Sequence, residues 1–379
     1  RGRVMDIELV RGIIEDYFVV IAYRGSAYEY ASSIVEFLVE PKSNNIEQLF
    51  DELYMKLSSK NIIPILDARQ GVLTLRLIER PEVFHTRSVF RKILPLILFL
   101  VTVTTVYISG IYLSMGYREL VGSRESIMLD ALLYSVSLMG VLLVHELGHY
   151  IVARLSGVPV SLPYFIPAPP ASIGLLGTFG AVINMRLPPK SINRLALIGL
   201  MGPLVGYIAA IPVALLGLNL SAKIPLSEAH KLAGNLIEIR AVPLTLKLIM
   251  DYSIRGNVTI LSHPVMLAAY FLFLITFLNL LPIGQLDGGH IVRSLTSTET
   301  HRIISMLVSS TLMVLGIVLA YTVDPIYMIF VFFSVLALIL TGRREHVGVL
   351  NNLSILSGKY RIIPLVYVIL LILTIPIPG

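Results

Sequence analysis

Seven long apolar runs limit what this chain can fold into more than any other feature of its sequence. Several of them reach the roughly 20 residues that an α-helix needs to cross a bilayer. Only 14% of all residues are charged, whereas a soluble globular protein carries about 25%. We therefore predict a polytopic α-helical membrane protein with about seven spans. The runs are Ile93–Tyr117, Ala131–Arg154, Leu195–Ala222, Leu261–Leu286, Ile303–Val323, Pro325–Gly342 and Ile362–Gly379.

Basic residues are distributed unequally between the two sides of these predicted spans. If the N-terminus is cytoplasmic, most of them, such as Arg87, Arg154 and Arg343, fall on the cytoplasmic side. Arg118 and Arg124 fall on the opposite side, each beside a glutamate. This pattern follows the positive-inside rule. We therefore assign the net charge of +6 to membrane topology, and we expect no nucleic-acid partner.

Residues 1–86 contain no long apolar run and differ in composition from the rest of the chain. Asn45 can cap a helix over 46–60 whose apolar residues share one face. Short segments rich in β-branched and aromatic residues predict strands on both sides of this helix. The pattern indicates a small soluble α+β domain over 1–86, followed by a transmembrane domain over 87–379. The expected strands are Tyr17–Tyr23, Ser33–Glu40, Ile62–Leu66 and Val72–Leu77.

The second apolar run contains the stretch His145-Glu146-Leu147-Gly148-His149. This is the H-E-x-x-H pattern that is typical of zinc peptidases. On a helix, His145 and His149 lie on one face and can bind the same Zn²⁺, while Glu146 can take a proton from water. Ionisable side chains at bilayer depth usually mark a functional site. The alternative is a pair of core histidines that hydrogen-bond to neighbouring helices.

A third metal ligand is expected, because a catalytic zinc has three protein ligands and one open position. The chain has no cysteine, so the ligands must be nitrogen and oxygen atoms. Asp287 lies at the end of the fourth apolar run, where Pro282 and Gly284 can break the helix and turn the carboxylate inward. In the predicted topology, His149 and Asp287 both lie near the cytoplasmic side. The alternative role for Asp287 is to cap the next helix.

Two loops between the spans have distinct compositions. Residues 159–190 contain five prolines and several glycines, so they cannot form a spanning helix. Within them, Leu176–Met185 is compatible with a strand, and we predict a hairpin or re-entrant loop packed against the site; the alternative is a surface loop. Farther along, Leu236–Met250 is predicted to form an amphipathic helix on the membrane surface.

Taken together, the motif at His145–His149 and the stretch Asn279–Gly289, which contains Pro282 and Asp287, resemble the two motifs of the site-2 protease family of intramembrane zinc metalloproteases. The span between them contains Gly202-Pro203, which is similar to a helix of this family. Residues 163–184 are most similar to its archaeal and chloroplast branch. The resemblance covers about 127–295 and implies that this is the catalytic core, with additional spans over 296–379.

This resemblance implies that His145, His149 and Asp287 bind one Zn²⁺ per chain and that Glu146 is the general base. It implies that Asn279 helps to hold the substrate or the oxyanion; the alternative for Asn279 is an interhelical hydrogen bond. The implied partners are a transmembrane protein substrate and the lipid bilayer, and the implied location is the plasma membrane of a prokaryote. No segment resembles the PDZ domain of many family members, and the sequence does not indicate an oligomeric state.

Two other functions are compatible with part of the pattern. A metal-ion transporter also places histidines and carboxylates within the membrane, but here these residues form one cluster and no inverted repeat is present. A catalytically silent homologue that binds membrane segments would not need Glu146. Because a scissile peptide bond must be extended, we expect an endopeptidase to present its substrate by strand addition to the loop 159–190.

Overall fold

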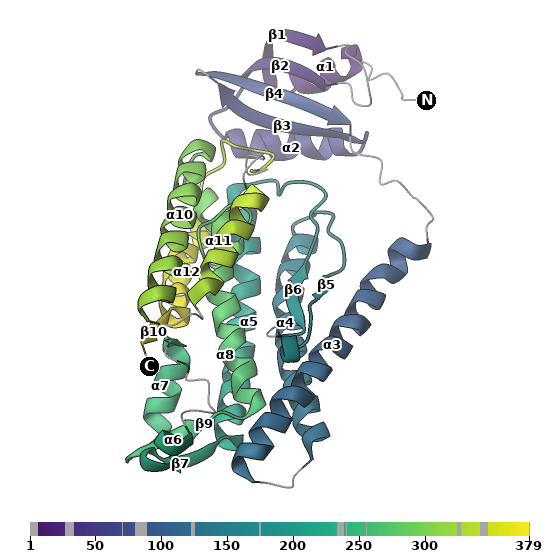
Figure 1. Cartoon of the computed structure of the whole chain (residues 1–379). Coiled ribbons are helices and arrows are strands. Elements are labelled where there is room, and N and C mark those ends of the chain that lie inside the picture. Colours follow the sequence, from purple (N-terminus) through teal and green to yellow (C-terminus); the bar gives the residue numbers. More distant parts are fainter. Residues whose placement is uncertain are drawn as a thin grey trace. The chain divides into compact units, whose positions relative to one another are not determined.

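The computed structural model describes residues 7–26, 34–69, 71–79, 89–122, 126–173, 176–232, 239, 241–254, 256–323, 327–341 and 348–378. These residues form two compact units, which are described separately (Figure 1). The first unit combines the N-terminal part of the chain with two later segments, Pro188–Leu195 and Val347–Gly358. The second unit contains the remaining described residues, including most of the apolar helices.

A four-stranded antiparallel sheet with the strand order β1-β2-β4-β3 forms the centre of the first unit (Figure 1). Phe18, Phe37 and Phe50 are buried in its core. The side chain of Asn45 accepts a hydrogen bond from the backbone of Gln48 at 3.2 Å, so Asn45 is the predicted N-cap. The elements are α1 (Ile7–Glu15), β1 (Phe18–Ser26), β2 (Ile34–Pro41), α2 (Ile46–Ser58), β3 (Ile62–Arg69) and β4 (Val72–Glu79).

Two features of this unit were not predicted from the sequence. The first is α1, a short amphipathic helix that buries Val10 and Ile14. The second is the pairing of β3 with a distant segment: the backbone N–H of Leu66 donates to Leu350 O at 2.8 Å, and that of Asn352 donates to Leu66 O at 3.0 Å. Such pairing covers backbone groups that an edge strand would leave unpaired. The unit therefore includes residues well beyond the predicted range 1–86.

Among the described residues, four helices of the second unit are long and apolar enough to cross a membrane. Three further apolar helices are shorter, so the expected number of seven spans remains a prediction. The four long helices are α3 (Val89–Val121), α4 (Ile127–Leu155), α5 (Ile192–Leu220) and α10 (Thr298–Thr322). The shorter ones are α8 (Pro264–Asn279), α11 (Met328–Thr341) and α12 (Ile363–Thr374).

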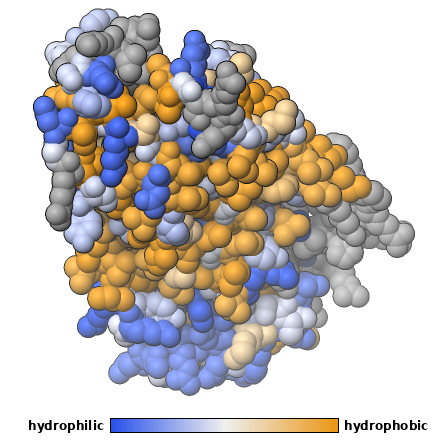
Figure 2. All heavy atoms as spheres, turned by 90° about the horizontal axis from the view of Figure 1, so that it is seen from below, coloured by the Kyte–Doolittle hydropathy of each residue, from blue (hydrophilic) through white to orange (hydrophobic). Residues whose placement is uncertain are grey.

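Apolar side chains also cover much of the outer surface of this unit. On α3, the side chains of Leu96, Leu100 and Tyr112 are all more than half exposed, and apolar residues occupy a large part of the face that Figure 2 shows. Soluble proteins rarely expose apolar patches of such size. The exposed apolar surface and the long apolar helices identify an integral membrane protein.

The segments outside the helices of this unit form three small antiparallel strand pairs. The predicted hairpin in 159–190 is present as β5 and β6. The helix predicted over Leu236–Met250 is wrong for residues 241–243, which form β8. Pro243 has no N–H group and occupies the N-cap of α7, so the helix begins only after it. Residues 236–238 and 240 lie outside the described residues. The pairs are β5 (Tyr164–Pro167) with β6 (Thr178–Val182), β7 (Ala222–Pro225) with β9 (Val258–Leu261), and β8 (Ala241–Pro243) with β10 (Pro376–Pro378).

The remaining short elements complete the second unit. Of these, α9 matters for the site because it carries the predicted ligand Asp287 as its first residue. Another short helix, α7, follows β8 in the chain and precedes β9. The short elements are the 3-10 helix η1 (Ala171–Ile173), α6 (Leu226–Leu232), α7 (Leu244–Ser253), α9 (Asp287–Arg293) and the 3-10 helix η4 (Gly358–Ile362).

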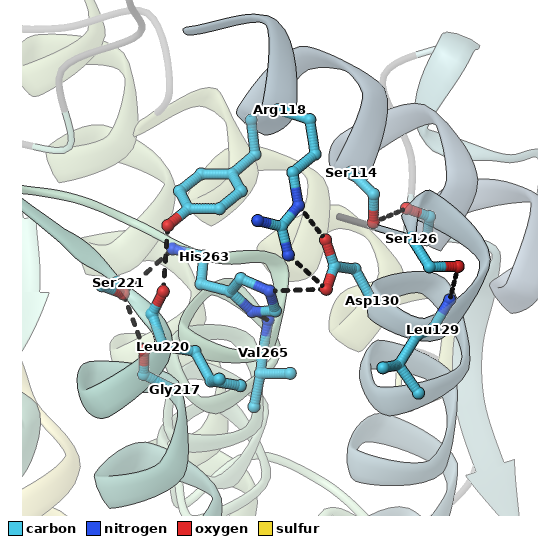
Figure 3. A network of polar contacts seen from close by, with 12 residues as sticks. Ser114, Arg118, Ser126, Leu129, Asp130, Gly217, Leu220, Ser221, His263 and Val265 are labelled. Atoms are coloured by element: carbon cyan, nitrogen blue, oxygen red, sulfur yellow. Dashed lines mark hydrogen bonds and ion pairs between the residues drawn. The ribbon is translucent and has the colours of Figure 1, made fainter. Parts of the chain in front are cut away.

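A buried polar network joins four elements at the N-terminal end of α4 (Figure 3). Asp130 accepts hydrogen bonds from the Nε and a terminal nitrogen of Arg118 on α3, at 2.6 and 2.9 Å. Its Oδ1 also lies 3.1 Å from Nε2 of His263, which caps α8. The backbone N–H of His263 donates to Ser221 at the end of α5. This network links α3, α4, α5 and α8 by charged and neutral hydrogen bonds in the protein interior.

Candidate metal centre

Two helices of the second unit bring three metal-binding side chains together. His145 and His149 lie one turn apart on α4, and Asp287 begins α9. The Nε2 atoms of the two histidines are 3.2 Å apart, and the carboxylate oxygens of Asp287 lie 3.3 Å from the first and 3.2 Å from the second. Both histidines are buried, and 15% of the Asp287 side chain is exposed. The three side chains thus form a compact donor set that is nearly closed to solvent.

The spacing of these atoms fits a tetrahedral metal ion. Zinc binds histidine nitrogen and carboxylate oxygen at about 2.0–2.2 Å, and two ligands at a tetrahedral angle are then about 3.3 Å apart. The observed separations of 3.2–3.3 Å match this value. Among the described residues, these three form the one group of histidine and acidic side chains arranged to hold a metal ion. Their assignment as ligands remains a prediction that this geometry supports.

A backbone carbonyl of α5 fixes the orientation of His149. Its Nδ1 lies 2.7 Å from the carbonyl oxygen of Ile198. Because a carbonyl can only accept a hydrogen bond, Nδ1 must carry the proton, and Nε2 is left with a lone pair that faces the donor set. Metal-binding histidines commonly have their second nitrogen held in this way. No side-chain pattern identifies such a backbone contact, so the sequence did not reveal the role of Ile198.

Glycines on α5 provide the space in which the two imidazoles lie. A Cβ atom on Gly202 would overlap Nε2 of His149, and one on Gly206 would lie 2.9 Å from Nδ1 of His145. A Cβ atom on Gly199 would lie 2.8 Å from the backbone oxygen of Asp287. In the sequence, Gly202-Pro203 in this part of α5 was identified only by its similarity to a helix of the site-2 protease family. The structure adds that its glycines allow the predicted ligands to approach the backbone of α5.

Asp287 is not the N-cap of α9. The N-cap position is occupied by Leu286, and Asp287 is the first helical residue, with its carboxylate directed to the two histidines. The helix α8 ends at Asn279, and a non-helical segment over residues 280–286 connects it to α9. The predicted break near Pro282 and Gly284 therefore separates the two helices and brings the carboxylate to α4.

Glu146 and Asn279 have different positions relative to the donor set. Glu146 follows His145 directly on α4 and is 7% exposed. Asn279 is the last residue of α8 and is half-buried. No hydrogen bond joins either side chain to another residue in the described part of the chain, so the alternative of an interhelical hydrogen bond for Asn279 finds no support. Their expected roles in catalysis remain predictions.

The fold and the donor set define a class of polytopic helical proteins with a buried candidate metal centre. Comparison with known families shows which family of this class the chain matches. Residues 133–323, about half of the chain, match the model of Peptidase family M50. The matched range contains both histidines and Asp287. The chain therefore belongs to peptidase family M50.

Two plant proteins illustrate the similarity to curated relatives. "Probable zinc metalloprotease EGY1, chloroplastic" from Arabidopsis thaliana is 33% identical over 173 residues, which are 43% of this chain and 29% of the relative. "Probable zinc metalloprotease EGY2, chloroplastic" from the same plant is 29% identical over 168 residues, or 42% of this chain and 28% of the relative. The chain thus matches less than a third of the length of these relatives.

A solved structure has a related description. "Site-2 Protease from Methanocaldococcus jannaschii" is 20% identical, and the superposition covers 63% of this chain and 88% of that chain with a TM-score of 0.33. Because this TM-score is low, the family assignment rests on the sequence match over residues 133–323.

Proposed function

We propose that this chain is an intramembrane zinc endopeptidase that hydrolyses peptide bonds within transmembrane segments of other proteins. The observation that carries this proposal is the 3.2–3.3 Å spacing of donor atoms from His145, His149 and Asp287, inside an apolar helical unit. Glu146, which directly follows His145 and is also buried, supplies the group for proton transfer. Membership of a peptidase family supports the same chemistry.

In this mechanism, His145, His149 and Asp287 hold the zinc ion. When bound, zinc polarises a peptide carbonyl and lowers the pKa of water. The Oε atom of Glu146 accepts a proton from the attacking water and then delivers it to the leaving amide nitrogen. The side-chain amide of Asn279 is proposed to donate a hydrogen bond to the scissile carbonyl oxygen as negative charge develops on it.

The β5–β6 hairpin is the proposed site where the substrate is held in an extended form. In the described part of the chain, β5 and β6 form a two-stranded sheet without a third strand. Phe179 and Val182 on β6 are about half exposed, at 52% and 51%. An added strand could hydrogen-bond to a free edge of this hairpin and expose its own peptide carbonyls to attack.

Substitution of Gly180 tests this part of the proposal. Gly180 has φ +94°, which L-residues rarely adopt, and its surroundings leave space for a side chain. Gly180→Val should therefore distort β6 without filling a cavity. We expect slower cleavage with unchanged zinc content, whereas Gly116→Ala, in an open position on α3, should leave both unchanged. Full activity of Gly180→Val would count against strand addition at β6.

We propose that the N-terminus is cytoplasmic, on the basis of the distribution of basic residues. The proposed location is the plasma membrane of a prokaryote, because residues 163–184 resemble the archaeal branch of the family as well as the chloroplast branch. The curated relatives carry names that indicate chloroplasts. A transmembrane protein is the proposed substrate, and lipid is the proposed environment. Transport of metal ions is less well supported, because a transporter needs several ion sites along a path and the described residues contain one group arranged to hold a metal ion.

The experiment that tests the proposed function uses the full chain reconstituted into liposomes with a single-span test protein. Glu146→Gln should still bind one zinc ion per chain but lose cleavage by about 100- to 10,000-fold, as expected for removal of a general base. The control is Glu119→Gln, since Glu119 is exposed at the end of α3. Cleavage at the wild-type rate by Glu146→Gln would contradict the proposal, and zinc flux into the liposomes would favour a transporter instead.

A further inference from the structure

The position of Asp287 depends on the non-helical segment over residues 280–286 that precedes it. Pro282 has no N–H group, and Gly284 has φ +51°, so this segment cannot continue the hydrogen bonding of α8. Its backbone forms few internal bonds, of which Ile283 N to Leu281 O at 2.8 Å and Leu286 N to Ile283 O at 3.0 Å are two. In an apolar interior, its remaining N–H and C=O groups need partners from elsewhere in the protein.

Two side chains from later helices provide such partners. The hydroxyl of Tyr367 on α12 donates a hydrogen bond to Leu280 O at 2.9 Å. The Oγ atom of Ser305 on α10 accepts one from the backbone N–H of Gly284 at 3.0 Å. This Oγ also lies 3.3 Å from the carbonyl oxygen of Pro282. Ser305 and Tyr367 are buried, with exposures of 2% and 7%, so water does not compete for these bonds.

The first turn of α9 lies directly against the same segment. A Cβ atom on Gly288 would overlap Leu280 O, and one on Gly289 would overlap Gly284 O. Tyr367 hydrogen-bonds to Leu280, and Ser305 hydrogen-bonds to Gly284. The helix α9, which begins with Asp287, packs against these same two backbone positions. A shift of this segment would therefore move the start of α9 and the carboxylate of Asp287 with it.

We infer that Ser305 and Tyr367 are positioning residues for Asp287: they hold residues 280–286 so that the carboxylate stays 3.2–3.3 Å from the two histidines. They act through the backbone and do not touch the donor set. Tyr367 lies outside the range 133–323 that matches the family model. The inference rests on the proposed function, because it assumes that Asp287 binds zinc. It gives α10 and α12 a role in the metal centre.

The chain contains closely matched controls for both positions. Tyr117 is also 7% exposed, and its hydroxyl also donates to a backbone carbonyl, Leu220 O, at 2.9 Å, but at the opposite end of the bundle. Ser309 lies one turn beyond Ser305 on α10 and is fully buried; its hydroxyl has no hydrogen-bond partner in the described part of the chain. Loss of these hydroxyls changes the interior of the protein without affecting residues 280–286.

The test measures metal binding by the purified full chain rather than activity. Zinc affinity is obtained by competition with a chromophoric chelator, and the visible absorption of the Co²⁺-substituted protein reports the ligand geometry. Tyr367→Phe and Ser305→Ala should each weaken zinc binding by about 10-fold, the lower end of what loss of indirect support for a ligand costs. Both should alter the Co²⁺ spectrum. Tyr117→Phe and Ser309→Ala should keep the wild-type affinity and spectrum even if their Tm falls equally.

Hydrogen exchange in the metal-free protein provides a second measurement. We expect faster exchange over residues 280–287 in Tyr367→Phe and Ser305→Ala, and wild-type exchange there in the two controls. If the wild type binds zinc and both variants bind it equally tightly with the same Co²⁺ spectrum, the positioning inference is overturned while the proposed function stands. If the wild type binds no zinc, the proposed function itself is overturned. If one variant fails to fold, the other still decides the matter.

Discussion

The two ends of α4 each carry a buried polar cluster built from aspartate and histidine, and the clusters differ in how their charges are satisfied. Asp130 lies near the N-terminal end of the helix, and His145 is 15 residues later, or about 22 Å along the helix axis. Both residues are at most 5% exposed. The difference between the two clusters supports the choice of one of them as the proposed metal site.

At the N-terminal end, the protein satisfies its own charges. The carboxylate of Asp130 is paired with the guanidinium of Arg118 through two hydrogen bonds (Figure 3). Nδ1 of His263 accepts a hydrogen bond from the backbone of Val265, so its Nε2 carries the proton and can donate to Asp130. The carboxylate of Asp130 is thus paired with a guanidinium and faces an imidazole N–H, so its charge is balanced by the protein itself.

At the C-terminal end, acceptors face one another. In the neutral imidazole of His149, Nε2 carries a lone pair because Nδ1 donates to Ile198 O. It lies 3.2 Å from Nε2 of His145 and 3.2 Å from a carboxylate oxygen of Asp287. In this arrangement, only a cation or additional protons can satisfy all three groups. The comparison thus separates a cluster whose charge the protein balances from one whose arrangement supports the proposed metal ion.

The largest effect that separates the clusters is expected from Asp287→Ala. This change removes a direct ligand, so zinc affinity should fall by more than about 100-fold, beyond the loss seen for indirect partners of a ligand. Cleavage of a transmembrane test protein should fall to background. Zinc content after dialysis, measured by mass spectrometry, checks this expectation. Retention of one zinc ion per chain would show that Asp287 is not a ligand.

Asp130→Ala should have a large effect of another kind. It removes the carboxylate that pairs with the guanidinium of Arg118, and breaking a buried ion pair costs about 3–5 kcal/mol in the free energy of unfolding. Denaturant unfolding in detergent measures this loss, with Asp251→Ala as a control at an exposed carboxylate on α7. The folded fraction should still bind one zinc ion. Loss of zinc from folded Asp130→Ala would break the distinction between the clusters.

Gly202→Ala tests whether the space beside His149 is required. The added methyl group would overlap the imidazole, so we expect the ring to be displaced and zinc affinity to fall by about 10- to 100-fold. The control is Gly140→Ala on α4, where the added methyl group meets no atom within 4 Å. Calorimetric zinc titration of both variants compares them. Equal affinity would mean that α5 adjusts to the methyl group.

The smallest expected effect comes from His263→Asn, and the other cluster offers the same change as a comparison. His263→Asn keeps a side chain suited to the N-cap of α8 but loses the contact with the carboxylate of Asp130, so it should cost about 2 kcal/mol of stability. Its zinc affinity should equal that of the wild type. The same change in the other cluster, His149→Asn, should abolish zinc binding. Thermal unfolding and zinc titration of the two variants are compared directly.

The sequence was informative where chemistry depends on side-chain type and spacing. The distance between His145 and His149 predicts a shared helix face, and the break around Pro282 predicts that Asp287 can leave its helix. Asn45 was identified as a helix cap because its type and position indicate one. These are local patterns, and the physical rules that govern them act over a few residues.

The sequence was not informative where a contact involves the backbone or residues far apart. The carbonyl of Ile198 that orients His149 exists in every residue and has no signature. Ser305 and Tyr367 act on a segment that is 21 or more residues away, and their types are common in apolar helices. Likewise, the pairing of Leu66 with Leu350 depends on tertiary folding. Such contacts can be found only once the elements are placed in space.

The measurement that tests the central claim most directly is zinc X-ray absorption of the purified full chain. We expect one zinc ion per chain with a first shell of nitrogen and oxygen atoms at about 2.0–2.2 Å, including two imidazoles. In Asp130→Ala the spectrum should be unchanged, and in Asp287→Ala it should be lost. A protein that binds no zinc, or one whose zinc spectrum changes with Asp130 but not with Asp287, would contradict the assignment of the metal centre to the C-terminal end of α4.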